Sequence, residues 1–243
     1  MKILVFGNSH MGALMRSFYE RESAHHFFNS NSFEFVGVIG KNFRKIKASK
    51  EKIEIILPEN FLSKGDGAKQ RKITESGITI NFCNFADYDI VIWAEGLNLI
   101  HFYHSMLGGS KEYNPAFLTR SLAKVVFERV FKFNKLFSKL RSETPNTRFV
   151  YTGQPISFSY KAVVNKKRFA NANSVHLRNI NYLRDTLLEP RKELGLVMSP
   201  DACIHASGLF SLEEFARDIK QDTGHAGLNY GKHLWKEIIQ IIQ

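Results

Sequence analysis

The chain has 243 residues, of which 44% are hydrophobic and 13% aromatic, and a formal net charge of +11 at pH 7. This composition excludes a disordered chain, and the length suits a single α/β domain spanning residues 1–243. Cys83 and Cys203 form no motif, which argues against a disulfide framework and favours a reducing, cytoplasmic location. No apolar run is long enough for a signal peptide or a membrane span, so we expect neither.

The positive charge concentrates in three stretches, at residues 41–52, 120–148 and 161–168. They fit solvated helix faces and loops, or attraction to an anionic partner such as an acidic glycan, a phosphate-bearing donor or an anionic membrane surface. No helix-turn-helix, zinc-finger or RNP-like aromatic motif occurs in the sequence. Nucleic acid is therefore the weakest of the anionic partners.

The first elements form a strand–turn–helix unit. Lys2–Phe6 is a β-branched and aromatic run that ends at Gly7–Ser9, and a helical pattern starts at Met11. In a parallel sheet such a turn lies at the carboxyl edge, where ligands bind. Ser9 is therefore either an exposed nucleophile or simply the N-cap of the helix.

Further strands are predicted at Phe33–Ile39, Asp89–Ala94, Arg148–Thr152 and Ala202–His205. The Asp89–Ala94 run is the strongest of these, because it is continuously apolar, as expected for a strand buried on both faces. The basic connection over residues 41–76 is expected to carry a helix or a short strand.

Helical spacing predicts helices over residues 115–142, Ser211–Ile219 and Asn229–Ile242. The first has an apolar face that includes Val125, and the second starts with a capping-box pattern. Strands that alternate with helices predict a three-layer α/β/α sandwich with a mainly parallel sheet and right-handed crossovers.

Four short blocks follow predicted strands or precede the last helix: Gly7–Ser9, Gly40, Gly96–Asn98 and Asp222–His225. Acyl transfer by serine needs a hydroxyl at a turn, an imidazole base, a carboxylate that orients the base, and donors for the oxyanion. Ser9, His225 and Asp222 can fill the first three roles. The Gly40 and Ser9 N–H groups and the Asn98 amide can be the donors.

These blocks, in this order, resemble the SGNH (GDSL-type) hydrolase superfamily, whose fold is a flavodoxin-like sandwich. The resemblance implies a serine ester hydrolase or O-acyltransferase that needs no cofactor or metal. It implies a catalytic Ser9, His225 and Asp222, and an oxyanion hole of Gly40 and Asn98, with Gly37 as the alternative to Gly40. Asn8 departs from the family, which usually has aspartate there.

The resemblance also favours a small acyl ester or an acylated glycan as the substrate, and the net charge favours an anionic one. The alternative is an inactive SGNH-fold binding or scaffold protein in polysaccharide biosynthesis, which Asn8 permits. His10 and Gly96 are candidates for substrate contact, although His10 fits equally well as a helix-turn histidine. His101 and His104 have a metal-compatible spacing, but no nearby cysteine or carboxylate completes a set, so no metal site is predicted.

Overall fold

The computed structural model describes residues 1–7, 10–20, 26–37, 47–49, 52–54, 82–94, 119, 121, 125, 139, 141–153, 195–197, 199–206, 210–218 and 222–243. Within these ranges, the backbone alone is described for residues 47–49, 52–54, 82–83, 218 and 222–224.

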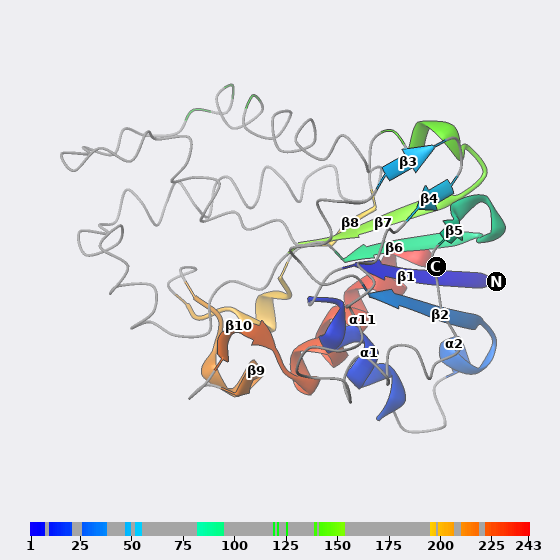
Figure 1. Cartoon of the computed structure of the whole chain (residues 1–243). Coiled ribbons are helices and arrows are strands. Elements are labelled where there is room, and N and C mark those ends of the chain that lie inside the picture. Colours follow the sequence, from blue (N-terminus) through cyan, green and yellow to red (C-terminus); the bar gives the residue numbers. More distant parts are fainter. Residues whose placement is uncertain are drawn as a thin grey trace, which may run out of the picture.

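A five-stranded sheet forms the centre of the molecule, and all of its neighbouring strands are parallel (Figure 1). Its order is β2-β1-β6-β7-β8. Counted along the chain this is the 2-1-3-4-5 order of flavodoxin-like sheets, with the reversal of strand order between β1 and β6. The predicted α/β fold with a parallel sheet is confirmed. The strands are β1 (Lys2–Gly7), β2 (Ser32–Gly37), β6 (Ile90–Ala94), β7 (Arg148–Thr152) and β8 (Leu196–Val197).

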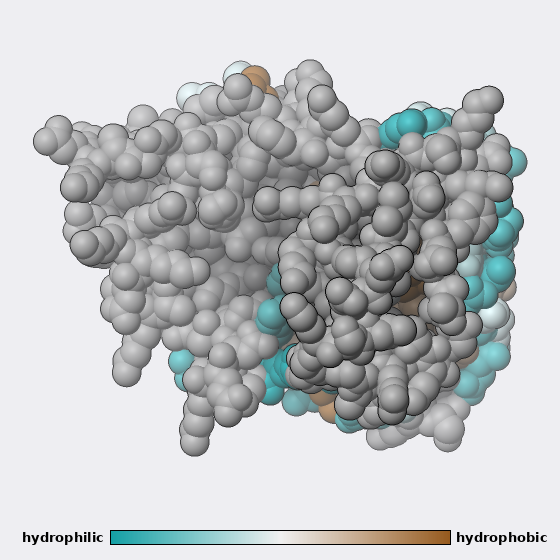
Figure 2. Space-filling model, in the orientation of Figure 1, coloured by the Kyte–Doolittle hydropathy of each residue, from teal (hydrophilic) through white to brown (hydrophobic). Residues whose placement is uncertain are grey.

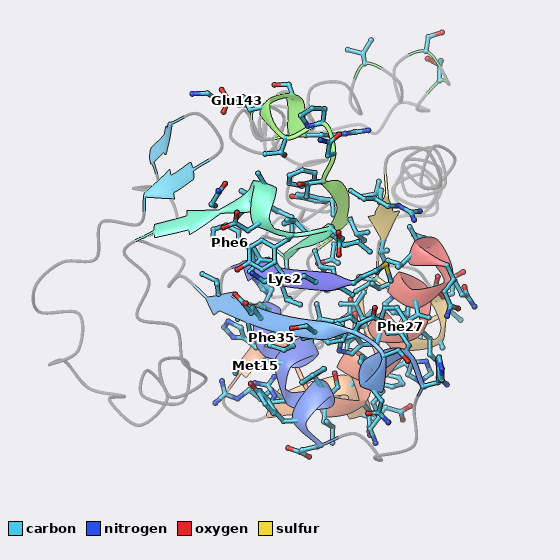
Figure 3. All side chains as sticks on the ribbon, turned by 90° about the vertical axis from the view of Figure 1, so that its right-hand side faces the viewer. Lys2, Phe6, Met15, Phe27, Phe35 and Glu143 are labelled. Carbon is cyan, nitrogen blue, oxygen red and sulfur yellow. The ribbon has the colours of Figure 1, made fainter. Side chains whose placement is uncertain are left out.

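Both faces of the inner strand β1 are buried. Ile3 and Val5 join the core cluster that the helices of one face complete. Leu4 and Phe6 lie on the other face, where the Phe6 ring packs against Trp93 with centroids 4.9 Å apart. Figure 3 shows Phe6 and Met15 on opposite sides of the sheet. Burial on both faces explains why β1 and β6 are continuous apolar runs without alternation.

Three helices cover one face of the sheet: α1 (Met11–Tyr19), α2 (His26–Asn29) and α11 (Leu228–Ile242). α1 and α11 lie side by side, and the Trp235 indole N–H donates to the Leu14 carbonyl at 3.0 Å (Figure 1). Phe27 of α2 and Phe35 of β2 belong to the same core cluster. The predicted C-terminal helix is confirmed, starting one residue earlier than expected.

A small antiparallel sheet follows β2 in the chain. It consists of β3 (Lys47–Ser49), β4 (Lys52–Glu54) and β5 (Phe82–Asn84), in that order. The 3-10 helix η1 (Phe85–Asp87) then leads into β6. The short strand expected in the basic connection over residues 41–76 is confirmed, at β3 and β4.

The predicted strand at Ala202–His205 is wrong. The 3-10 helix η2 (Asp201–Cys203) occupies most of it, and Ile204 makes an isolated bridge to Ser211. The Cys203 N–H donates to the Pro200 carbonyl at 2.9 Å, so it is not available for a strand ladder. The fifth strand of the sheet is β8 instead.

The predicted helix at Ser211–Ile219 is also wrong. The 3-10 helix η3 (Glu213–Phe215) leads into β9 (Ala216–Asp218), which pairs with β10 (Asp222–Ala226). Leu212, not Ser211, is the N-cap of η3, and it makes no side-chain capping bond. The Leu212 N–H donates to the Cys203 carbonyl, so pairing with distant segments overrides the local capping signal.

The predicted helix over residues 115–142 is described only in part. Ser121, Val125 and Lys139 are helical, as are residues 141–143, and the rest lies outside the described residues. Val125 was expected on the apolar face, but its side chain is 53% exposed. Val125 therefore does not lie on a buried face.

The described surface is mostly polar in the view of Figure 2, where teal residues dominate the right-hand edge. Among the helices of the described residues, none is both long and apolar enough to cross a membrane. The single domain spanning residues 1–243 stays a prediction.

Gly231 sets how closely α1 and α11 approach. A Cβ at this position would lie 2.2 Å from the Ala13 carbonyl oxygen and 2.6 Å from Ser17 Oγ. The Ser17 hydroxyl donates to the Ala13 carbonyl at 2.9 Å. The added methyl group would therefore clash with the backbone of α1 and not only with a flexible side chain, so the two helices would have to move apart.

We expect Gly231→Ala to lower the free energy of unfolding by about 1–3 kcal/mol through overpacking. This loss would outweigh the gain of ~1 kcal/mol that alanine brings over glycine inside a helix. Urea unfolding followed by circular dichroism measures it. Lys236→Ala, at an exposed position of the same helix, is the control and should change stability little. An unchanged or raised midpoint for Gly231→Ala would contradict the close-approach explanation.

Candidate active site

The candidate site lies where β1 and β6 end. Gly7, the last residue of β1, is in register with Ala94, the last residue of β6. A Cβ on Gly7 would lie 2.2 Å from the Ala94 carbonyl oxygen, so only glycine fits at this point. Because the strand order reverses between these two strands, their carboxyl ends mark the usual ligand-binding crevice of such sheets.

His10 opens the helix that follows β1. It is the N-cap of α1, with φ −72° and ψ −22°, and its side chain makes no capping hydrogen bond. The alternative in which Ser9 caps this helix stays a prediction, because the backbone of His10 already has helical φ and ψ. Ser9 itself lies outside the described residues, between the described Gly7 and His10.

His225 comes to this point from the other end of the chain. It lies in β10, and its ring stacks on the ring of His10, with centroids 5.4 Å apart and ring planes 24° apart. The last predicted block is thereby brought against the residue that follows Ser9. In Figure 1 the β9–β10 hairpin lies on the side toward which the β1 arrow points.

Two contacts hold β10 in this place. The Arg16 guanidinium of α1 donates to the carbonyl of Ala226, the residue after His225. On the other side, the Gly227 N–H donates to the Phe215 carbonyl at 2.7 Å. α1 therefore contacts the His225 segment through both a ring stack and a charge-assisted hydrogen bond.

The irregular pairing of β10 bears on the role of Asp222. In a regular strand, residues three apart point to opposite faces, which would separate Asp222 from His225. Here Asp222 pairs with Asp218 and Ala226 pairs with Ala216, so the pairing register shifts between them. Such a bulge breaks the alternation of side chains and allows both on one side. The Asp222 side chain lies outside the described residues.

The structure thus brings together two of the residues singled out in the sequence, His10 and His225. The sequence alone did not predict their stacking, nor the role of Arg16, because neither has a local signal. The remaining site residues lie wholly or in their side chains outside the described residues, and their roles stay predictions: Ser9, Gly40, Gly96, Asn98 and Asp222.

Clearly perturbed pKa values among the described residues belong to the core beside α11. Burial raises the pKa of the Cys203 thiol to about 12, and the nearby Glu214 carboxylate adds to the rise. Burial also raises the pKa of Tyr230, whose hydroxyl donates to Ser199 Oγ at 3.0 Å. In the described part of the chain, no group of three or more His, Cys, Asp or Glu side chains could hold a metal ion.

No family model and no curated protein matches the sequence. Solved structures do match. A GDSL-like lipase from Parabacteroides merdae has 12% identity and a TM-score of 0.42 over 99% of this chain and 94% of its own. The periplasmic domain of a lipopolysaccharide acetyltransferase from Salmonella ser. Paratyphi A has 13% identity and a TM-score of 0.40 over 100% and 84%. An extracellular lipase from Streptomyces rimosus has 12% identity and a TM-score of 0.43 over 99% and 98%.

By name, these solved structures are hydrolases and an acyltransferase. At TM-scores of 0.40–0.43, neither activity nor substrate is inferred from them. The observed strand order is the flavodoxin-like order that the SGNH resemblance implied. The chain therefore resembles SGNH (GDSL-type) hydrolases in its four motifs and in its sheet.

The buried thiol makes stability depend on alkaline pH. The ordinary pKa of a cysteine thiol is 9.0, and the pKa of Cys203 in the folded protein is about 12. As the pH rises, the thiol therefore ionises in the unfolded state first. The stabilisation is complete below about pH 9 and is lost as the pH rises toward 12. The raised pKa of Tyr230 acts in the same direction at somewhat higher pH.

We expect the urea concentration at the unfolding midpoint of the wild type to decrease as the pH is raised from 8 to 11. For Cys203→Ala this decrease should be smaller. The comparison of the two slopes cancels the titration of the lysines that both proteins share. Equal slopes would show that Cys203 does not contribute. The measurement is urea unfolding by tryptophan fluorescence at pH 8, 9, 10 and 11.

Proposed function

We propose that this protein is a serine esterase or O-acyltransferase of the SGNH type, with Ser9 as nucleophile, His225 as general base and Asp222 as its orienting carboxylate. The observation that carries the proposal is the stacking of His225 on His10, at 5.4 Å between ring centroids. His10 follows Ser9 directly in the sequence, so this contact supports His225 as the base that acts on Ser9.

The reaction follows from these roles. The His225 imidazole accepts the Ser9 hydroxyl proton as Ser9 Oγ bonds to the ester carbonyl carbon. The resulting oxyanion accepts hydrogen bonds from the N–H groups of Ser9 and Gly40 and from the Asn98 amide. When the intermediate collapses, the ester C–O bond breaks and the leaving alkoxide takes the proton from His225.

The second half of the reaction frees the enzyme. His225 removes a proton from water or from an acceptor hydroxyl, whose oxygen attacks the acyl-enzyme carbonyl. Ser9 then leaves and regains its proton from His225, so no proton or electron is left over. Water as acceptor makes the protein an esterase, and a sugar hydroxyl makes it an acyltransferase.

The proposed substrate is an acylated carbohydrate or glycan precursor. The net charge of +11 supports an anionic substrate, because a positive field raises the local concentration of anions. A cytoplasmic enzyme would meet such precursors before export. No cofactor is needed for this chemistry.

We expect Ser9→Ala to lower the hydrolysis of p-nitrophenyl acetate by at least about 1,000-fold, because without the nucleophile no acyl-enzyme forms. A fluorophosphonate probe should label the wild type on Ser9 and leave Ser9→Ala unlabelled. Ser30→Ala, at an exposed serine beside α2, is the matched control and should retain full activity and labelling.

If wild type and Ser9→Ala hydrolyse the ester equally slowly, and no adduct forms on Ser9, the proposed serine esterase activity is contradicted. This result would favour the second candidate, a binding protein on the same fold. Asn8, at the position where the family usually has aspartate, is the observation that favours this alternative.

A further inference from the structure

We propose that His10 is a positioning residue for His225, whose imidazole plane it fixes by stacking. This inference rests on the proposed function, because it takes His225 as the general base. It differs from the substrate-contacting role that the sequence suggested for His10.

The geometry of the ring pair suits this role. The two ring planes are 24° from parallel, and their centroids are 5.4 Å apart. An imidazole makes its hydrogen bonds through Nδ1 and Nε2, in the plane of the ring. A partner stacked on the ring face therefore limits its tilt and leaves both nitrogens to Asp222 and Ser9.

His10 is itself held by a rigid element. It is the N-cap of α1, and its Nδ1 atom is buried. The next turn of α1 is anchored to α11, since the Trp235 indole donates to the Leu14 carbonyl at 3.0 Å. The His10 ring is thus held in a fixed position, and the ring of His225 packs against it.

His225, by contrast, lies in a short and irregular strand. β10 runs from Asp222 to Ala226, and its pairing with β9 shifts register within that span. A bulge re-aims side chains but leaves the local ladder incomplete, so the strand constrains the ring of His225 less than a regular sheet would. The Arg16 bond to Ala226 fixes the backbone, and His10 supplies the constraint on the ring.

The orientation of a base matters for rate more than for binding. A displacement of about 1 Å in a catalytic group can cost ~100-fold in rate. Substrate binding does not require the base, so the loss should appear in kcat and not in KM.

The experiment compares His10→Ala, His10→Phe and His205→Ala in p-nitrophenyl acetate hydrolysis. We expect His10→Ala to lower kcat by about 10–100-fold with KM within about threefold of wild type. His10→Phe, which keeps a flat ring without nitrogens, should restore most of the lost kcat. His205 stacks on Phe210 at 4.2 Å, so His205→Ala removes a comparable ring pair outside the site and should leave activity unchanged.

Several results would overturn the inference. His10→Ala with wild-type kcat means that the stack does not position the base. A raised KM at unchanged kcat means that His10 binds substrate instead. If His10→Phe is as impaired as His10→Ala, the nitrogens of His10 matter and stacking does not. Urea unfolding of each variant separates these results from a loss of fold.

Adding His225→Ala and the fluorophosphonate probe to this experiment distinguishes a failure of the proposed function from a failure of the inference. A wild type that neither hydrolyses the ester nor labels Ser9 contradicts the proposed function and the inference with it. An active wild type that loses activity in His225→Ala but not in His10→Ala contradicts the inference alone.

Discussion

The parallel pairing of β1 with β6 is the constraint on which the rest of the structure depends. β1 lies between β2 and β6 in the sheet, and the strand order reverses between β1 and β6. The two strands end together at Gly7 and Ala94, and the backbone of Ala94 leaves no room for a side chain on Gly7. The proposed chemistry depends on that shared end, because the blocks with the serine and the asparagine follow the two strands directly in the sequence.

α1 converts this end of the sheet into a candidate site. Its N-cap, His10, stacks on His225, and its Arg16 donates to the backbone carbonyl of Ala226. Its inner face packs on α11, where Gly231 allows the helices to approach closely. The same short helix therefore links the first and last predicted blocks, which explains how residues at opposite ends of the chain come together.

The sequence predicted best those buried elements whose apolar residues follow a single strand or helix pattern throughout. The run at β6 is continuously apolar and is buried as a whole, and α11 keeps its apolar spacing over its full length. The failures came where local and tertiary preferences conflict. The capping pattern at Ser211 resembles a helix start, yet the segment pairs with Cys203 and β10. Hydrogen bonds to other segments of the backbone are not visible in the pattern of a short stretch of sequence.

The sequence by itself determined the class of fold, through buried parallel strands alternating with helices, and it singled out His10 and His225 as separate candidates. Only the tertiary structure decided that these two rings stack and that His225 lies in an irregular strand, β10. The physical reason is the range of the interactions. The periodicity of apolar residues can be recognised from residues that are close in the sequence. A ring stack and a strand register depend on segments that meet only after the chain has folded.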